Sequence, residues 1–262
     1  MKTVSEFPEV VKPTAELLPE LRRLWQSTFF DGDAFLNAFF STAYSSERAR
    51  CLLWNGEVAG MLYWLDCYLD GARIAYIYAV ATKEEYRGRG VCRRLMEDTH
   101  RCLAALGYSG SILSPATDEL FGLYRKMGYT HITSMGELEC RAGEAAACIS
   151  SVSAEEYGRL RRVFLPIGGI VQEDVSLDFL ATQAEFYSGD GFLLAARRLG
   201  GGQLLGVELL GDISCAPSVL RALGCEKGSF RSPSAPSQRP FAAYRPIIEK
   251  TAVPTYLGHA FD

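Results

Sequence analysis

The sequence predicts an α/β protein with a mixed sheet, and three observations lead to this fold class. Runs with helical periodicity occur at both ends of a block of β-branched and aromatic runs. Within that block, Asn55-Gly56 and Asp70-Gly71 favour tight hairpins, because both dipeptides tolerate positive φ. Helical runs then separate the later strand-like runs, which is typical of a parallel crossover. We therefore expect an antiparallel meander that leads into a parallel step.

The elements of the first half follow from local patterns. Leu17, Leu21 and Leu24 share one face of a helix over residues 14–30. Glycine commonly ends a helix, and Gly107 and Gly128 stand at two such positions. The remaining predicted elements are a helix over 33–44, strands over 49–54, 58–68 and 73–82, a helix over 91–106, a strand over 108–114, a helix over 118–127 and a strand from 129.

The second half is expected to form a smaller α/β domain. The segment RAGEAAA, residues 141–147, is small and featureless and is interpreted as a linker, so the domains are 1–142 and 146–262. The segments LYRKMGYTHITS and LRALGCEKGSFRS each predict a helix, a glycine stop and a strand, which indicates that the second domain is a degenerate repeat of the first. The predicted elements are helices over 154–164, 177–187 and 217–223, a hairpin of 192–198 with 203–210, a loop over 232–240 and a strand over 241–245.

Composition argues against several classes of function. The net charge is -4 over 262 residues, whereas proteins that bind nucleic acid usually carry a basic surplus. The longest apolar runs are shorter than the roughly 20 residues that cross a bilayer. The N-terminal residues lack the apolar segment of a signal peptide. We therefore expect a cytoplasmic protein that binds neither nucleic acid nor membrane.

The cysteines and histidines do not indicate a metal site. There are eight cysteines and three histidines, with no C-x-x-C pair and no recognisable zinc-ligand spacing. Most cysteines lie among apolar residues, where a free thiol behaves as a small hydrophobe. We expect free, structural cysteines and no bound metal.

One short stretch does indicate chemistry. The segment EYRGRGVCRRLM, residues 85–96, places Gly88 and Gly90 among four arginines where a helix is expected to start. The first N–H groups of a helix have no partner within it, and the helix dipole adds positive charge there. Without β-carbons, the backbone can approach a phosphate closely. The turn is therefore a candidate anion site, although a simple turn followed by a solvated basic helix face is the alternative.

The wider context resembles a known family. The segment has neither the phosphate-loop pattern nor the dinucleotide pattern. It resembles the acetyl-coenzyme A motif of the GNAT N-acetyltransferases, [QR]-x-x-G-x-[GA], with Arg87 in the first place, Gly90 in the fourth and Cys92 in the sixth, where the family usually has glycine or alanine. VATKEEYRGRG is similar to the end of that family's fourth strand, with Glu84 in place of the usual proline. The resemblance covers about residues 10–140.

The resemblance implies a GNAT fold with splayed central strands and acetyl-coenzyme A (acetyl-CoA) as co-substrate. The pantetheine arm would hydrogen-bond between the fourth and fifth strands like an added strand. Val80 N–H would face the thioester carbonyl. The implied cofactor-binding residues are Val80, Ala81, Thr82, Arg87, Gly88, Arg89, Gly90, Val91, Cys92, Thr117 and Tyr124.

A second landmark implies a catalytic tyrosine. LFGLYRKMGY, residues 120–129, resembles the family segment A-x-x-L-Y-x-K-x-G-F, and Tyr124 holds the place of the tyrosine beside the coenzyme A sulfur. A phenol with a pKa near 10 can protonate or hydrogen-bond a departing thiolate. Tyr124 and Val80 are therefore the predicted catalytic residues. A packed aromatic on an amphipathic helix is the alternative for Tyr124, and Thr117 replaces a frequent asparagine.

The group that accepts the proton of the attacking amine is left open. Tyr76 and Tyr78 are interpreted either as lining an acceptor pocket or as core residues, and a base acting through water is a further alternative. The candidate carboxylates are Asp66, Asp70, Glu84, Glu85 and Asp262.

The leading hypothesis is an N-acetyltransferase that moves an acetyl group from acetyl-CoA to a primary amine of a small molecule or peptide. The second domain, GNAT-like or accessory, would shape the acceptor site or the interface of a homodimer. The alternative is a non-catalytic acyl-CoA sensor, which would bind the carrier without transfer. A pure interaction scaffold would explain neither motif.

Overall fold

The computed structural model describes residues 7–249 and 251–261. The chain forms two compact units, and their limits do not follow chain order. The first contains the described residues up to Asp66, Ala72–Tyr129 and Arg245–Thr251, whereas the second contains Cys67–Gly71, Thr130–Tyr244 and the residues from Ala252. The predicted domain limits, 1–142 and 146–262, remain a prediction.

The first unit is a five-strand sheet with helices on both faces. The strands lie in the order β1-β2-β3-β4-β5, and β4 and β5 are parallel, whereas β2 is antiparallel to both β1 and β3. This is the predicted α/β fold with a mixed sheet. The elements are β1 (Glu9–Val11), α1 (Leu18–Phe29), α2 (Asp33–Thr42), β2 (Ala49–Trp54), β3 (Glu57–Leu69), β4 (Ala72–Thr82), α3 (Val91–Ala105), β5 (Gly110–Leu113) and α4 (Asp118–Arg125), with short 3-10 turns at Ala15–Leu17, Ser46–Arg48 and Glu84–Tyr86.

Two tight turns connect the meander as the sequence predicts. Asn55 and Gly56 have φ of 52° and 82°, and Asp70 and Gly71 have φ of 49° and 79°. Two successive left-handed residues form the type I′ turn, whose twist matches that of paired strands. The dipeptides therefore set the hairpin geometry locally.

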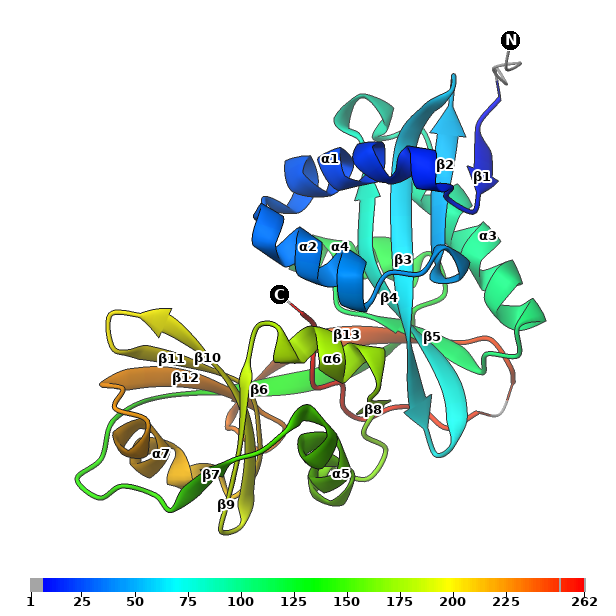
Figure 1. The fold of residues 1–262 in the computed structure, drawn as a ribbon. Helices are drawn as coiled ribbons and strands as arrows, with labels where there is room; N and C mark the ends of the chain where they lie inside the picture. Colours follow the sequence, from blue (N-terminus) through cyan, green and yellow to red (C-terminus); the bar gives the residue numbers. More distant parts are fainter. Residues whose placement is uncertain (1–6, 250, 262) are drawn as a thin grey trace. The chain divides into compact units, whose positions relative to one another are not determined.

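Strand β3 packs against helices on both of its faces. A Cβ on Gly60 would lie 2.6 Å from Cγ1 of Val91, so the missing side chain lets α3 approach one face. On the other face, the ring of Trp25 from α1 lies 5.4 Å from Tyr63 and 4.7 Å from Phe39 of α2. In Figure 1, α1 and α2 accordingly lie on one side of these strands and α3 on the other.

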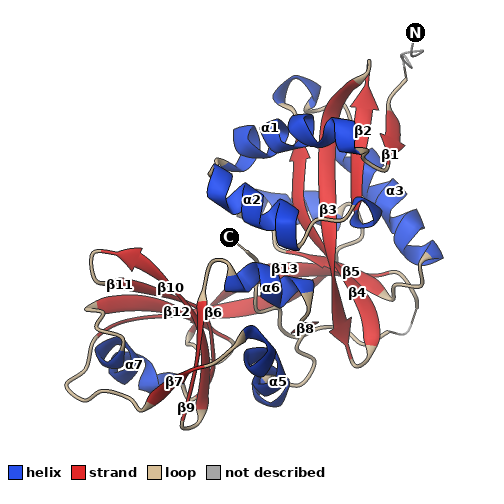
Figure 2. Ribbon diagram, in the orientation of Figure 1, coloured by secondary structure: helices blue, strands red, loops and turns tan. Residues whose placement is uncertain are grey.

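The second unit has the strand order β7-β9-β10-β11-β12-β6-β13. Helix α5 packs against β9, β10 and β11, and α7 packs against β6 and β12 (Figure 2). The elements are β6 (His131–Arg141), β7 (Ile149–Ser151), α5 (Ala154–Phe164), β8 (Val171–Gln172), α6 (Val175–Ala181), β9 (Glu185–Gly189), β10 (Phe192–Gly200), β11 (Gln203–Gly211), α7 (Ala216–Ala222), β12 (Lys227–Ser232) and β13 (Ser237–Pro246), with a 3-10 turn at Ile213–Cys215.

Two predicted elements of this unit are wrong. The predicted helix over 177–187 is the short helix α6 followed by strand β9, because Glu185–Gly189 pairs with β10 along its length. The predicted loop over 232–240 is strand in part, because residues 237–240 belong to β13, which pairs with β6. Pro240 is tolerated there because the register shifts between it and Ala242.

The second unit repeats the strand plan of the first. In each unit, three strands that are consecutive in sequence are also neighbours in the sheet, β2-β3-β4 and β9-β10-β11. The last of the three pairs in parallel with the next strand, β4 with β5 and β11 with β12, and a helix, α3 or α7, connects the two parallel strands. The second unit has no helix between β12 and β13 in the place of α4. This topology agrees with the predicted degenerate repeat.

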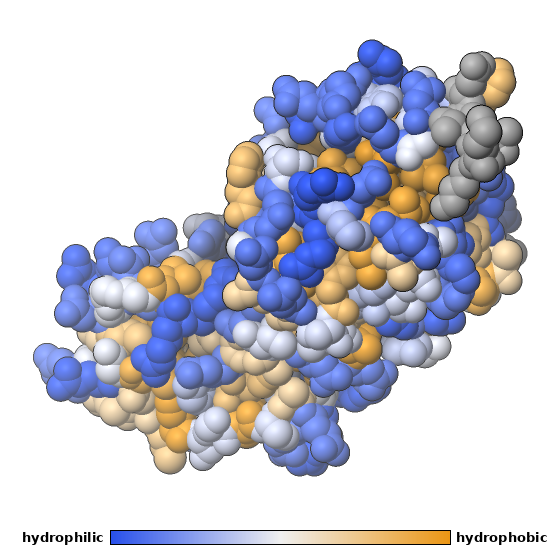
Figure 3. All heavy atoms as spheres, turned by 45° about the horizontal axis from the view of Figure 1, so that its top comes forward, coloured by the Kyte–Doolittle hydropathy of each residue, from blue (hydrophilic) through white to orange (hydrophobic). Residues whose placement is uncertain are grey.

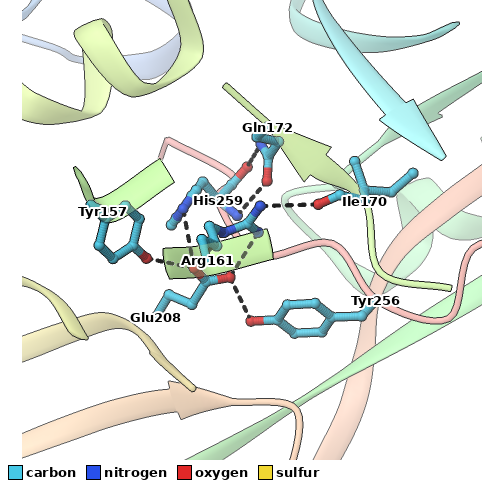
Figure 4. Close-up of polar contacts among 7 residues, drawn as sticks. All are labelled: Tyr157, Arg161, Ile170, Gln172, Glu208, Tyr256 and His259. Carbon is cyan, nitrogen blue, oxygen red and sulfur yellow. Dashed lines mark hydrogen bonds and ion pairs between the residues drawn. The ribbon is translucent and has the colours of Figure 1, made fainter. Parts of the chain in front are cut away.

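A polar cluster lies in the core of the second unit (Figure 4). Glu208 of β11 accepts hydrogen bonds from Arg161 and from the hydroxyls of Tyr157 and Tyr256. His259 Nε2 lies 3.2 Å from the same carboxylate. A Cβ on Gly258 would lie 1.9 Å from Glu208 Oε1, so the C-terminal segment reaches this carboxylate closely. The cluster therefore fixes that segment to the unit.

The surface drawn in Figure 3 mixes hydrophilic and apolar residues. Several large apolar side chains are well exposed, among them Phe30 and Ile167. Among the described residues, no helix is both long and apolar enough to cross a membrane.

Candidate active site

Strands β4 and β5 part near the middle of β4. Their register runs from Ile74 opposite Gly110 to Tyr76 opposite Ile112, and β4 then continues to Thr82. The residues of β4 after Tyr76 are therefore not paired with β5. This unpaired part of β4 contains Val80, Ala81 and Thr82. The family resemblance implies that the backbone groups of these residues bind the cofactor.

Ala79 interrupts the upper part of β4. Its φ is 49°, a left-handed conformation that is uncommon for a residue with a side chain. The side chains of three successive residues, 78–80, are half-buried, and Ala81 is buried. The alternation of buried and exposed side chains that is usual in a strand is therefore absent here. The sequence gave no signal for this feature, because alanine has no preference for a left-handed φ.

The glycine-arginine turn opens helix α3. Gly88 and Gly90 have φ of 74° and 82°, and a Cβ at either would meet no described atom within 4 Å. The glycines are thus required by backbone conformation, and the space beside them is open. The sequence reasoning missed the first of these reasons, although two glycines before a helix are a signal for positive φ.

The first N–H groups of α3 have no partner within the helix. The first intrahelical hydrogen bond runs from Arg94 N to Gly90 O, so the N–H groups of Val91, Cys92 and Arg93 precede it. No side chain in the described part of the chain caps this end. Val91 itself is buried, so its side chain belongs to the core while its N–H lies at the helix start. These donors and the helix dipole favour an anion.

The charged residues around the turn differ in their roles. Arg89 lies over the rings of Trp54 and Tyr86, at 5.9 and 5.8 Å from their centroids. Arg87 Nε donates a hydrogen bond to Thr82 O at 3.4 Å. This hydrogen bond occupies a backbone carbonyl of a residue that the family resemblance assigns to cofactor binding. Its side chain, like that of Arg89, is exposed. Both arginines belong to the loop that precedes α3.

Tyr124 lies in α4 and is 7% exposed. Its ring makes an edge-to-face contact with Tyr129, with centroids 5.8 Å apart. Burial raises the pKa of Tyr124 well above its ordinary value, with a smaller contribution from Cys92. Burial also raises the pKa of Cys92 to about 11. Both groups are therefore protonated near neutral pH, and the phenol can act as a hydrogen-bond donor.

Thr117 lies at the N-cap position of α4 and is exposed. Its side chain hydrogen-bonds to Glu119, which lowers the pKa of that carboxyl. Thr117 therefore lies at the N-terminus of the helix that carries Tyr124.

Asp66, one of the carboxylates considered as bases, is engaged in a hydrogen-bonded network. Asp66 accepts hydrogen bonds from Arg73 Nη2 at 2.8 Å and from the Tyr108 hydroxyl. Burial would raise its pKa, but these two hydrogen bonds hold the pKa of Asp66 below its ordinary value. Asp66 is thus a stabilised carboxylate within a network.

The other candidates lie away from the strand opening or in exposed positions. Asp70 is exposed in the turn before β4 begins, and Val80 lies near the other end of that strand. Glu84 is exposed, and Glu85 forms an ion pair with Lys83 at 2.7 Å. Asp262 lies outside the described residues.

Tyr76 and Tyr78 belong to an aromatic cluster. Tyr76 is 2% exposed, and its ring lies 5.9 Å from that of Tyr78. Tyr78 is half-buried and lies 5.5 Å from Trp25 and 5.8 Å from Phe39. Tyr76 is therefore a core residue, and Tyr78 borders the core on the face covered by α1 and α2.

Two further residues near the site have no recognisable sequence signal. His100 of α3 and Arg245 form a hydrogen bond, and both contribute to a pocket of about 340 Å³ beside the end of α4. They are 145 residues apart. No group of three or more histidine, cysteine or acidic residues suited to a metal ion occurs within the described residues.

The fold and this geometry define an α/β protein in which the parallel strands β4 and β5 part after Tyr76, and in which α3 starts after two glycines without a side-chain cap from the described residues. Residues 9–132 match the family model of the acetyltransferase (GNAT) domain. No curated protein sequence is detectably similar to the chain.

Solved structures are similar over nearly the whole chain. A GCN5-related N-acetyltransferase from Kribbella flavida matches with a TM-score of 0.70 and 17% identity, over 93% of this chain and 72% of that chain. A probable N-acyltransferase from Enterococcus faecalis V583 matches with a TM-score of 0.67 and 17% identity, over 92% and 73%. A tandem GNAT protein from the clavulanic acid biosynthesis pathway matches with a TM-score of 0.56 and 10% identity, over 94% and 100%. At these identities the likeness concerns the fold.

Proposed function

We propose that this protein is an N-acetyltransferase that transfers the acetyl group of acetyl-CoA to a primary amine of a small molecule or peptide. The observation that carries the proposal is the parting of β4 and β5 next to the uncapped start of α3. An extended, amide-bearing arm fits beside β4, and a diphosphate fits the donors at the helix start.

The residues present suit such a co-substrate. Gly88 and Gly90 leave open space beside the turn, and the N–H groups of Val91 and Cys92 have no intrahelical partner. Arg89 is exposed and adds positive charge. These groups would hold the diphosphate, and the backbone of Val80, Ala81 and Thr82 would hold the arm.

In the proposed reaction, the neutral amine attacks the acetyl carbonyl, a carbon–nitrogen bond forms and the carbon–sulfur bond breaks. Val80 N–H would stabilise the charge that develops on the carbonyl oxygen. Tyr124 would donate its phenolic proton, or a hydrogen bond, to the departing thiolate. Before attack, the ammonium form of the acceptor would lose one proton to water, since Asp66 is held by Arg73 and Tyr108. The second proton, which the nitrogen releases as the amide forms, would pass through water to Tyr124 and restore its phenol.

The test is a thiol-release assay with acetyl-CoA and a broad panel of amines, combined with calorimetric titration of acetyl-CoA. Saturable binding together with amine-dependent thiol release would support the proposal. Binding with no transfer to any amine would instead indicate an acyl-CoA sensor. The absence of saturable binding would overturn the proposed function.

A further inference from the structure

Behind the ring of Tyr124, three buried side chains form a connected hydrogen-bonded series. The Tyr129 hydroxyl lies 2.9 Å from Nε2 of His100 and 2.8 Å from Oγ of Ser111. Nδ1 of His100 lies 2.8 Å from Nη1 of Arg245. Tyr129 and Ser111 are fully buried, and His100 is 6% exposed. The series therefore links Arg245 to β5 through His100 of α3 and through Tyr129, which lies four residues after the end of α4.

The direction of this series follows from the chemistry of arginine. A guanidinium can only donate, so Nδ1 of His100 must accept and the ring proton of the neutral histidine lies on Nε2. Burial, together with the charge of Arg245, lowers the pKa of His100 to about 3, so the ring is neutral at physiological pH. Nε2–H then faces the Tyr129 hydroxyl oxygen at 2.9 Å and Ser111 Oγ at 3.3 Å, and the hydroxyls of Tyr129 and Ser111 share a hydrogen bond of 2.8 Å in which either can donate.

Arg245 also holds the end of α4. Its Nη1 donates to Met127 O at 2.7 Å. Its side chain lies along Gly128, where an added Cβ would be 3.3 Å from Arg245 Cδ. Gly128 has φ of 91°, and the next residue, Tyr129, donates its N–H to Tyr124 O. The side chain of Arg245 thus contacts the turn that sets the position of both tyrosines.

The segment that carries Arg245 is itself fixed to the first unit. The chain leaves this unit after Tyr129 and returns to it at Arg245. The N–H groups of Ile247 and Ile248 both donate to Ser109 O, at 2.9 and 3.1 Å, immediately before β5. Arg245 is therefore presented to His100 from a backbone that is anchored to the central sheet.

We propose that Arg245 is a positioning residue for Tyr124 and acts on it through His100 and Tyr129. The inference rests on the proposed role of Tyr124 in acetyl transfer. Without the guanidinium, the turn after α4 loses the donor to Met127 O, and the His100 ring loses the contact that orients it. The Tyr129 ring, and the Tyr124 ring packed on its edge, are then less well fixed.

The kinetic test is Arg245→Met, with Arg101→Met as the matched control. Arg101 is an exposed arginine of α3 that pairs only with Asp98 in the described contacts. We expect kcat to fall about tenfold or more in Arg245→Met, since small misplacements of a catalytic group are costly, while the KM for acetyl-CoA stays within about twofold. The control should retain wild-type kcat. A wild-type kcat in folded Arg245→Met would overturn the inference.

Chemical rescue separates a positioning role from a loss of stability. His100 and Arg245 line two adjoining pockets, of about 340 and 400 Å³, so a small cation can reach the vacated position in Arg245→Ala. Millimolar guanidinium, well below denaturing concentrations, should restore part of kcat in Arg245→Ala and leave Arg101→Ala unchanged. Failure of guanidinium to restore kcat would contradict the proposed contact.

A readout independent of activity is nitrogen NMR of the three histidines, with His100→Asn used for assignment. In the wild-type protein we expect Nε2 of His100 to be protonated and Nδ1 unprotonated, and this preference should weaken in Arg245→Met. A proton on Nδ1 in the wild type would overturn the series. A wild-type protein without acetyl transfer would overturn the proposed function and this inference together, whereas an active wild type with an unaffected Arg245→Met would overturn this inference alone.

Discussion

Arg161 and Glu208 form a completely buried, bidentate ion pair in the second unit, with Nε 2.7 Å from Oε2 and Nη2 2.8 Å from Oε1 (Figure 4). The equivalent positions of the first unit carry an aromatic pair. Trp25 is the eighth residue of α1, and Arg161 is the eighth residue of α5. Tyr78 lies two residues after the last β4–β5 pair, and Glu208 lies two residues after the last β11–β12 pair. The Trp25 and Tyr78 rings are 5.5 Å apart. The repeat thus places charges in one unit where the other has aromatic rings.

Breaking this ion pair should cost more than replacing it. Glu208→Gln leaves the buried guanidinium of Arg161 without a counter-charge, and we expect a loss of about 3–5 kcal/mol in the free energy of unfolding. The double variant Arg161→Met with Glu208→Leu buries no charge and should be more stable than Glu208→Gln. Urea denaturation measures both. Glu156→Gln, at a half-buried surface carboxylate that pairs with Arg159, serves as the control and should change stability little. A double variant less stable than the single one would contradict this account.

The second unit should lose stability in mild acid. Burial lowers the pKa of His259 to about 4, and the charge of Arg161 outweighs burial to hold the pKa of Glu208 well below its ordinary value. Both groups bind protons more readily in the unfolded chain, so the stability that they contribute is lost as the pH falls. For His259 the loss should begin near pH 6.5 and extend to about pH 4.

Thermal unfolding between pH 7 and 4 measures this effect, and His259→Gln should flatten part of the decline. His100 contributes in the same direction because its pKa is also lowered, so the decline should not vanish entirely. His131, which is exposed, provides the control variant His131→Gln. An equal decline in wild type and His259→Gln would show that His259 does not take up protons on unfolding.

Replacing Gly90 should weaken binding of acetyl-CoA. Gly90→Val places a branched side chain at a φ of 82° and into the open space beside the turn. We expect the dissociation constant from calorimetry to rise at least about tenfold, together with a stability loss of roughly 1–2 kcal/mol from backbone strain. Gly71→Val is the matched control, since Gly71 has φ of 79° and equally open surroundings. It should show the strain without the loss of affinity, and equal affinities in the two variants would count against the assigned site.

Removing the phenolic hydroxyl of Tyr124 should reduce turnover without loss of binding. Tyr124→Phe keeps the buried ring and its contact with Tyr129, but removes the proton donor. We expect kcat to fall about 100-fold, in the range of general acid catalysis, with an unchanged KM for acetyl-CoA. Steady-state thiol release measures both constants. Tyr187→Phe, whose hydroxyl bonds to Glu185 in the second unit, should behave as the wild type. Undiminished turnover in Tyr124→Phe would end its role as proton donor.

Much of the fold could be predicted because its signals are local. The periodicity of α1 and α3 and the two hairpin dipeptides depend on residues close in sequence, and the structure confirms them. Strand β9 and the first four residues of β13, 237–240, were misassigned because their pairing with β10 and β6 decides their conformation. The short strands β1, β7 and β8 were missed for the same reason.

The sequence by itself determined the glycine-arginine turn, since positive φ at Gly88 and Gly90 and the start of α3 are properties of neighbouring residues. The resemblance implied that the fourth and fifth strands splay, but only the tertiary structure decided that they part after Tyr76, that Ala79 is left-handed, and that Arg245 reaches His100. Those features depend on contacts between segments far apart in the chain. Such contacts are set by packing and by the need of buried polar groups for partners, and no local pattern encodes them.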